Sequence, residues 1–83
     1  MKIKLRNATN LEELRLERNW EVELPESSTV GDLLSKLGLN RLREGGSISS
    51  LVMLFKNKKS VRSVEEKLHD GDYLDIMPTI SGG

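Results

Sequence analysis

Hydrophobic and polar residues alternate near both ends of the chain, at the spacing of half-buried β-strands. Ile3 and Leu5 are interleaved with lysine and arginine, and Leu74 and Ile76 with tyrosine and aspartate. Successive side chains of a strand point to opposite faces, so this period of two predicts one buried and one solvent-facing side. The last run closes at Pro78, which has no N–H to donate to a sheet. We therefore expect a first and a last strand here.

A second alternating run, residues 20–24, ends at a proline and would pair with the first strand as a hairpin. The segment between them, residues 7–19, has two interpretations. Leu11 and Leu14 lie at helical spacing, but Leu14 and Leu16 also continue the alternation that leads to Trp20. The pattern leaves a short helical turn and an early extension of the second strand as equal alternatives.

Residues 29–37 have the clearest helical pattern. One apolar stripe follows the spacing i, i+3, i+4 and i+7, at Val30, Leu33, Leu34 and Leu37. Thr29 is a good N-cap, and Asp32 stands three residues on, where it can complete a capping box. Gly38 follows the stripe, where a left-handed residue is favoured.

The middle of the chain changes from polar to apolar. Residues 40–50 hold the pair Gly45-Gly46 and several serines, which favours a loop. Residues 51–55 form a continuous apolar run, which indicates a central strand buried on both faces. A basic turn over residues 56–59 follows, and then a short edge strand that includes Val61 and Val64.

Two polar turns precede the last strand. Ser63 and Glu66 could cap one helical turn ending near Leu68. Gly71, between Asp70 and Asp72, can take the positive φ of a tight turn. The whole order is strand, strand, helix, strand, short strand, strand. It predicts an α+β fold with a mixed, four- to five-stranded sheet on one main helix, whose first and last strands lie parallel.

Composition narrows the range of functions. The chain has 83 residues, no cysteine and a formal net charge of zero. It therefore has no thiol nucleophile or disulfide, and it lacks the basic excess typical of nucleic-acid binders. No apolar run reaches the length of a membrane span, so we expect a cytoplasmic protein without nucleic-acid or membrane partners. One domain over residues 1–78 and a tail over residues 79–83 fit this length.

The remaining polar groups suggest little chemistry. His69 has no partner for catalysis or metal binding, and Asp70, Asp72 and Asp75 lack the spacing of a calcium loop. We expect no metal site. We interpret two sets of charged residues as solvated surface: a basic set, Lys56, Lys58, Lys59 and Arg62, and an acidic set, Glu12, Glu13, Glu17, Glu21, Glu23 and Glu26. For the basic set, the alternative is electrostatic steering onto an acidic partner.

The tail Thr79-Ile80-Ser81-Gly82-Gly83 carries the most chemical information. Its two glycines lack side chains and can enter a crevice where any Cβ would clash. Attack of a terminal carboxylate on the α-phosphate of ATP gives an acyl-adenylate, from which sulfide, a thiolate or an amine can displace AMP. The chain has no P-loop, so a partner enzyme would have to bind the ATP.

The strand order, residues 70–83 and the closing Pro-x-x-x-Gly-Gly resemble the ubiquitin-like β-grasp sulfur carriers. These include the small subunit of molybdopterin synthase (MoaD), the thiazole-pathway carrier (ThiS) and the archaeal small modifier proteins. The resemblance implies that an E1-like enzyme uses ATP to adenylate Gly83, with Gly82 beside it and no cofactor bound. Gly83 would then become a thiocarboxylate, which donates sulfur to molybdopterin or tRNA, or would be joined to a lysine of a target protein.

The resemblance also implies how partners are bound. Thr79, Ile80 and Ser81 would thread into a partner, which could be a larger molybdopterin-synthase-like subunit, and Met77 matches a docking position. Met53 and Phe55 could join Met77 in an exposed patch, or all three could pack under residues 7–19.

Two departures leave the pathway open. Thr79 stands where many molybdopterin-synthase subunits have a second proline, and residues 7–19 are longer than a thiazole carrier needs. Two other classes of function are possible. In the first, the chain is a non-catalytic interaction domain whose diglycine is incidental. In the second, it is a small catalytic subunit, which the lack of a nucleophile, base or metal cluster disfavours.

Overall fold

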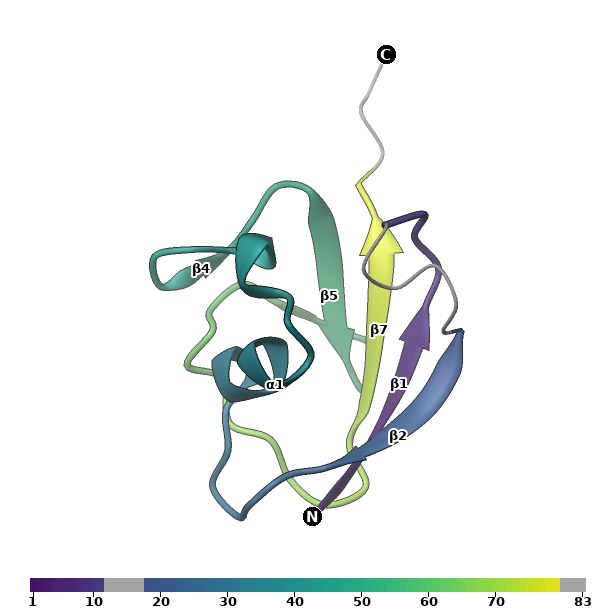
Figure 1. The fold of residues 1–83 in the computed structure, drawn as a ribbon, viewed down its shortest axis with the longest axis vertical. Helices are drawn as coiled ribbons and strands as arrows, with labels where there is room; N and C mark the ends of the chain where they lie inside the picture. Colours follow the sequence, from purple (N-terminus) through teal and green to yellow (C-terminus); the bar gives the residue numbers. More distant parts are fainter. Residues whose placement is uncertain (12–17, 80–83) are drawn as a thin grey trace.

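The computed structural model describes residues 1–11 and 18–79 (Figure 1). Its elements in chain order are β1 (Lys2–Asn7), β2 (Asn19–Glu23), α1 (Val30–Lys36), the 3₁₀ helix η2 (Asn40–Leu42), β3 (Arg43–Glu44), β4 (Ser47–Ile48), β5 (Val52–Lys56), β6 (Lys59–Val61) and β7 (Tyr73–Pro78). The alternating runs have become strands, and the apolar stripe has become α1.

Five of the strands form one mixed sheet in the order β2-β1-β7-β5-β6. β1 pairs with β2 antiparallel, with Ile3 opposite Val22, and with β7 parallel, with Leu5 opposite Leu74. Both the hairpin and the parallel pairing of the first and last strands are therefore confirmed. β7 lies in the middle of the sheet, and β2 and β6 form its two edges.

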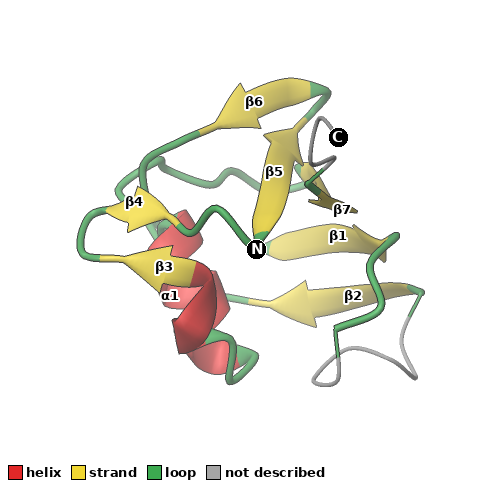
Figure 2. Cartoon of the chain, turned by 90° about the horizontal axis from the view of Figure 1, so that it is seen from above, coloured by secondary structure: helices red, strands yellow, loops and turns green. Residues whose placement is uncertain are grey.

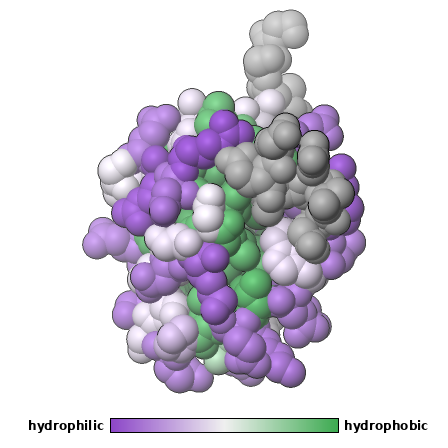
Figure 3. Space-filling model, viewed as in Figure 1, coloured by the Kyte–Doolittle hydropathy of each residue, from purple (hydrophilic) through white to green (hydrophobic). Residues whose placement is uncertain are grey.

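The hydrophobic core lies between α1 and one face of the sheet. Ile3, Leu5, Leu74 and Ile76 contribute from β1 and β7 and are almost completely buried, as is Leu33 of α1. Figure 2 shows α1 on one side of the sheet, and Figure 3 shows a band of hydrophobic residues running between α1 and the strands. No helix of residues 1–11 or 18–79 lies on the opposite side, and we call it the open face.

The ends of α1 are formed as the sequence predicts. Thr29 Oγ1 accepts the Asp32 N–H at 3.2 Å, and an Asp32 carboxylate oxygen accepts the Thr29 N–H at 2.9 Å, which completes the capping box. Gly38 has φ +71, the left-handed conformation that ends a helix.

Residues 40–50 are more ordered than the loop we expected. η2 buries Leu42, and β3 and β4 form a small hairpin, with Gly45 at φ +63 in its turn. Ser49 N–H donates to the Leu42 carbonyl at 2.8 Å. The buried side chain of Leu42 anchors this polar segment to the core. The serines and glycines of the sequence indicated a loop and gave no sign of this anchor.

The apolar run at β5 is buried on one face only, contrary to the prediction. Val52 and Leu54 are buried against the core, but Met53 is 41% exposed and Leu51, just before the strand, is 50% exposed. The strand is also second from the edge of the sheet and not at its centre. A single helix covers one face of this sheet, so alternate apolar side chains of β5 remain on the open face.

The helical turn expected from Ser63 to Leu68 is wrong. This segment forms turns and isolated bridges, and Ser63 Oγ accepts the Glu65 N–H at 3.1 Å. Its carbonyl groups serve the neighbouring helix instead, because Val30 and Gly31 donate their N–H groups to residues 66 and 64. Pairing with the start of α1 therefore overrides the local capping pattern.

The described part of residues 7–19 packs beside the core. Asn7 and Thr9 are buried, and Leu11 packs against the core cluster. The choice between a helical turn and an extended strand falls on residues 12–17, which lie outside the described residues. Within the described part of the chain, no helix is both long and apolar enough to cross a membrane.

Candidate functional site

The apolar half of the open face is formed by β5 and β7. Met53 pairs with Met77 across these antiparallel strands, and Phe55 pairs with Asp75. Met53 is exposed, whereas Met77 and Phe55 are half-buried. The structure thus brings together the three residues that the sequence singled out. The described part of residues 7–19 does not cover Met53.

The chain leaves the sheet next to these residues. Pro78, the last residue of β7, lies opposite Val52, and Thr79 Oγ1 donates to the Leu51 carbonyl at 3.3 Å. Exposed Leu51 therefore lies at the start of the tail. Sequence reasoning missed Leu51 because a continuous apolar run does not indicate which of its members face solvent. We call Leu51, Met53, Phe55 and Met77 the exit patch.

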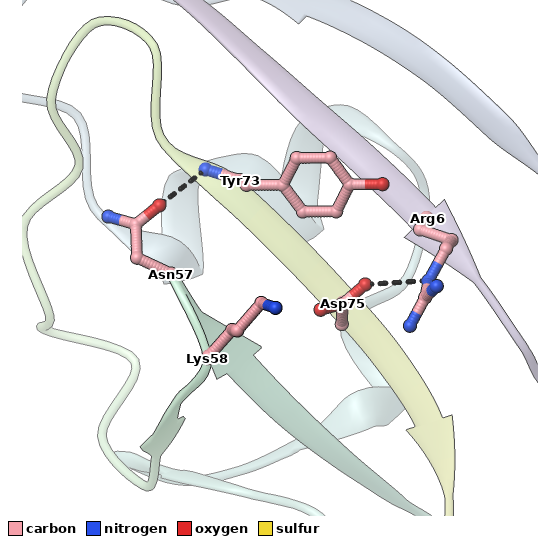
Figure 4. Close-up of a pocket in the computed structure, with 5 residues that line it drawn as sticks. All are labelled: Arg6, Asn57, Lys58, Tyr73 and Asp75. Atoms are coloured by element: carbon pink, nitrogen blue, oxygen red, sulfur yellow. Dashed lines mark hydrogen bonds and ion pairs between the residues drawn. The ribbon is translucent and has the colours of Figure 1, made fainter.

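The polar half of the open face holds a pocket of about 520 Å³, lined by Arg6, Asn57, Lys58, Tyr73 and Asp75. Figure 4 shows Asp75 between the side chains of Arg6 and Lys58. Arg6 Nε lies 2.8 Å from Asp75 Oδ1, which pairs a half-exposed cation with a carboxylate that is almost buried. Arg6 and Asp75 are direct neighbours on the parallel strands β1 and β7.

Asn57 fixes one wall of this pocket. Its Oδ1 accepts the Tyr73 N–H at 2.9 Å, its own N–H donates to the Tyr73 carbonyl at 2.8 Å, and its Nδ2 donates to Asp72 Oδ1 at 2.9 Å. Asn57 and Lys58 both have positive φ, which forms the two-residue turn between β5 and β6. The sequence indicated this basic turn but not the pocket, because the partners Asn57 and Tyr73 are sixteen residues apart.

The four residues of the basic set differ in their surroundings. Lys56 Nζ contacts Glu66 Oε2 at 2.8 Å and the Lys67 carbonyl at 3.0 Å, so it stabilises a loop and does not belong to a solvated basic surface. Lys58, Lys59 and Arg62 are exposed, in agreement with the interpretation as solvated surface.

The acidic groups near the last turn are structural. Asp70 Oδ1 accepts the Lys2 N–H, and Asp72 Oδ2 accepts the His69 N–H, both at 2.7 Å. Gly71 between them has φ +85, which confirms the tight turn. The described residues contain no group of three or more His, Asp or Glu side chains that could hold a metal ion.

Four of the predicted site residues, Ile80, Ser81, Gly82 and Gly83, lie outside the described residues. Their roles remain predictions. What the structure gives is the point from which the tail starts, at the end of the central strand and beside the exit patch.

A mixed five-stranded sheet with parallel central strands and one helix across a single face defines a ubiquitin-like β-grasp protein. The sequence matches the ThiS family over residues 5–83, and the chain belongs to that family. The match includes the end of β1, the other four strands of the sheet and the diglycine Gly82-Gly83. A comparison with curated protein sequences finds no match.

Several solved structures are similar over nearly their whole length. A Haloferax volcanii protein known from its solution structure is 28% identical, with a TM-score of 0.81, and the match covers 100% of this chain and 87% of that one. A Pyrococcus furiosus protein named as subunit 1 of the molybdopterin converting factor is 26% identical, with a TM-score of 0.75 and coverage of 96% and 99%.

Small archaeal modifier protein 1 of Haloferax volcanii has the same fold at 21% identity, with a TM-score of 0.74 and coverage of 95% and 98%. The family match and the Pyrococcus furiosus neighbour place the chain in the class of ubiquitin-like sulfur carriers, and the archaeal modifier protein shows that its fold is shared more widely. Members of this family are small protein carriers and not catalysts.

Proposed function

We propose that the chain is a protein co-substrate whose Gly83 carboxylate is adenylated by an E1-like enzyme and then converted to a thiocarboxylate or joined to a lysine. The observation that carries the proposal is the ThiS family match, which extends through Gly82 and Gly83. The start of the tail at the end of β7, next to exposed Leu51 and Met53, supports it.

The chemistry follows from the carboxylate. One Gly83 oxygen attacks the α-phosphorus of ATP, a C–O–P bond forms, and pyrophosphate leaves. A persulfide or sulfide then attacks the carbonyl carbon and AMP leaves; with a persulfide donor, a reductant of the thiol class releases the thiocarboxylate. A lysine amine attacking the same carbon displaces AMP, loses a proton and gives an isopeptide bond. The partner enzyme supplies the ATP site in each case.

The exit patch is the proposed docking surface for that enzyme. Exposed large apolar side chains gathered on one face of a small protein typically mark an interface. Leu51, Met53 and Met77 lie beside the tail, so an enzyme bound to them would have the tail within reach of its active site. A larger molybdopterin-synthase-like subunit is proposed to use the same surface, because both partners must receive the same tail.

The test is adenylation in vitro. The chain, with Gly83 confirmed as its last residue by intact mass, is incubated with an E1-like enzyme from the same organism, Mg²⁺ and ATP. We expect ATP–pyrophosphate exchange that depends on the chain. After addition of a sulfur donor, we expect a mass increase equal to the replacement of one oxygen by sulfur.

Two glycine variants provide matched controls. Gly82→Ala adds a methyl group to the reactive tail and should abolish exchange. Gly46→Ala makes the same change at the internal pair, where a Cβ would meet nothing within 4 Å, and exchange should be unchanged. Absence of both the adenylate and the thiocarboxylate with every E1-like enzyme of the organism would overturn the proposal.

A further inference from the structure

The edge strand β2 is the longest exposed edge of the sheet. It has five residues, against three for β6 at the opposite edge. The β6 edge is also partly covered, because Ile48 of β4 donates its N–H to the Arg62 carbonyl at 3.0 Å just beyond β6. An uncovered edge presents a row of unpaired N–H and C=O groups, to which another strand can be added.

The register shows which backbone groups point outward. Met1 and Leu24 exchange hydrogen bonds with each other, and Asn7 donates to the Arg18 carbonyl. Hydrogen-bonded pairs alternate along an antiparallel ladder, so Trp20 and Val22 also bond to β1. The N–H and C=O groups of the other three residues, Asn19, Glu21 and Glu23, point away from the sheet. Among the described residues, these outward groups have no hydrogen-bond partner.

The side chains of β2 divide between the two faces. Trp20 and Val22 pack against the core but are only half-buried, whereas Glu21 and Glu23 are exposed on the open face. Lys4 lies opposite Glu21, and Lys2 opposite Glu23, on the inner neighbour β1. Each glutamate therefore has a lysine on one side, and on the other side the described residues place no strand.

These charges disfavour pairing of β2 with a second copy of itself. In an antiparallel pair with full overlap, Glu21 faces its own copy, and in a register shifted by two residues it faces Glu23. Like charges directly opposite each other destabilise a strand pair, whereas a lysine or arginine opposite a glutamate stabilises it. The edge is thus complementary to a basic strand and unfavourable for its own copy.

From the outward backbone groups and this charge pattern, we infer that β2 accepts an extended segment of another protein as a sixth strand. That segment carries lysine or arginine at alternate positions, facing Glu21 and Glu23, and apolar residues between them, facing Trp20 and Val22. This surface is at the opposite edge of the sheet from β5 and β6, and the inference does not depend on the diglycine tail.

The experiment uses the full chain and a synthetic probe, acetyl-Lys-Val-Lys-Val-Lys-amide, with the Glu-Val-Glu-Val-Glu peptide for comparison. Amide hydrogen exchange and ¹H–¹⁵N NMR follow each residue during titration. We expect the basic peptide to slow exchange of the Asn19, Glu21 and Glu23 amides and to bind more tightly than the acidic peptide. Glu21→Lys combined with Glu23→Lys should reverse the preference between the two peptides.

A proline variant isolates the role of the backbone when it is compared with Glu21→Ala, which removes the same carboxylate but keeps the N–H. Glu21→Pro removes an outward N–H and leaves the bonds to β1 intact, because proline is tolerated where an edge N–H faces solvent. Loss of this bond should weaken the basic peptide about tenfold relative to Glu21→Ala. Ser60→Pro is the matched control on β6, where Ser60 occupies the equivalent non-bonded position opposite Phe55; it should leave peptide binding unchanged.

Three results would overturn the inference. One is equal binding of the basic and acidic peptides. Another is an affinity of folded Glu21→Pro equal to that of Glu21→Ala. The third is a wild-type dimer in sedimentation experiments whose exchange protection maps to β2. Adenylation of Gly83 is measured separately, so a failure here leaves the proposed function untouched, and the reverse also holds.

Discussion

At the scale of single residues, close backbone contacts hold α1 in place. Gly31 is buried and donates its N–H to the Val64 carbonyl at 2.8 Å. A Cβ at Gly31 would lie 3.0 Å from Arg43 Nη1 and 3.2 Å from both Cβ and O of Val64. The arginine end can move, but the backbone oxygen of Val64 is fixed by the same hydrogen bond. Glycine permits the close approach of the two backbones here, and no positive φ is involved.

Gly31→Ala is therefore expected to lower the free energy of unfolding by about 1–3 kcal/mol, the usual cost of overpacking. Urea denaturation followed by circular dichroism measures it. Lys36→Ala, on the exposed side of the same helix, serves as the control and should stay within about 0.5 kcal/mol of wild type. A Gly31→Ala protein as stable as the control would show that the two backbones can separate without cost.

The ion pair on the open face leads to an asymmetric prediction. Arg6→Ala leaves the almost buried Asp75 carboxylate without its cation, whereas Asp75→Ala leaves an arginine that is half-exposed and can be hydrated. We expect Arg6→Ala to cost more stability than Asp75→Ala, by about 1 kcal/mol, because an unpaired buried charge carries the larger desolvation penalty. Thermal unfolding of both single variants and of the double variant tests the order, and the reverse order would contradict it.

At the scale of elements, β5 shows how one strand serves two purposes. Its inward side chains Val52 and Leu54 belong to the core, and its outward side chain Met53 belongs to the exit patch. Period-two alternation was hidden in the sequence because both sides of this strand are apolar. The pairing with β7 shows which side chains face the core, because Leu54 lies opposite the core residue Ile76, whereas Met53 lies opposite Met77.

Substitutions on the two sides of β5 should separate stability from docking. Leu54→Ala removes buried methyl groups and should destabilise the protein by about 2–5 kcal/mol. Met53→Lys should change stability little, but it should raise the KM of the activating enzyme for this chain, because the exposed apolar contact is lost. Steady-state pyrophosphate exchange over a range of chain concentrations gives that KM, and an unchanged value would remove Met53 from the docking surface.

The elements that sequence reasoning identified correctly are those whose signal is local. Alternation in β1 and β7 and the stripe and capping box of α1 each lie within a few residues. The failures came where distant residues decide the structure. Ser63 to Leu68 follows the backbone of α1, and the pocket around Asp75 needs β1, β5 and β7 together. Likewise, the sequence offered a patch of Met53, Phe55 and Met77 as one of two alternatives, and it did not single out Leu51.

At the scale of the whole molecule, the core ends before the tail begins. In the part of the chain that the structure describes, the fifteen buried hydrophobic residues lie between Ile3 and Ile76. The last described residue, Thr79, is exposed and contacts Leu51 through a single hydrogen bond. We therefore expect body and tail to contribute to different properties, the first to stability and the second to the proposed reaction.

Removal of residues 80–83 should thus leave the free energy of unfolding within about 0.5 kcal/mol of wild type, while adenylation is lost. Chemical denaturation and pyrophosphate exchange on the same preparation measure the two effects. A truncated chain that unfolds much more easily would mean that the tail is part of the body.

The parallel pairing of β1 with β7 also determines how the protein would bear a mechanical load. The start of β1 and the end of β7 lie at opposite ends of this strand pair. Traction between the first residue and a molecule attached at the tail would pull the two strands in opposite directions along their length. Their hydrogen bonds would then be strained together rather than opened one after another, so the chain should withstand pulling from its C-terminal attachment.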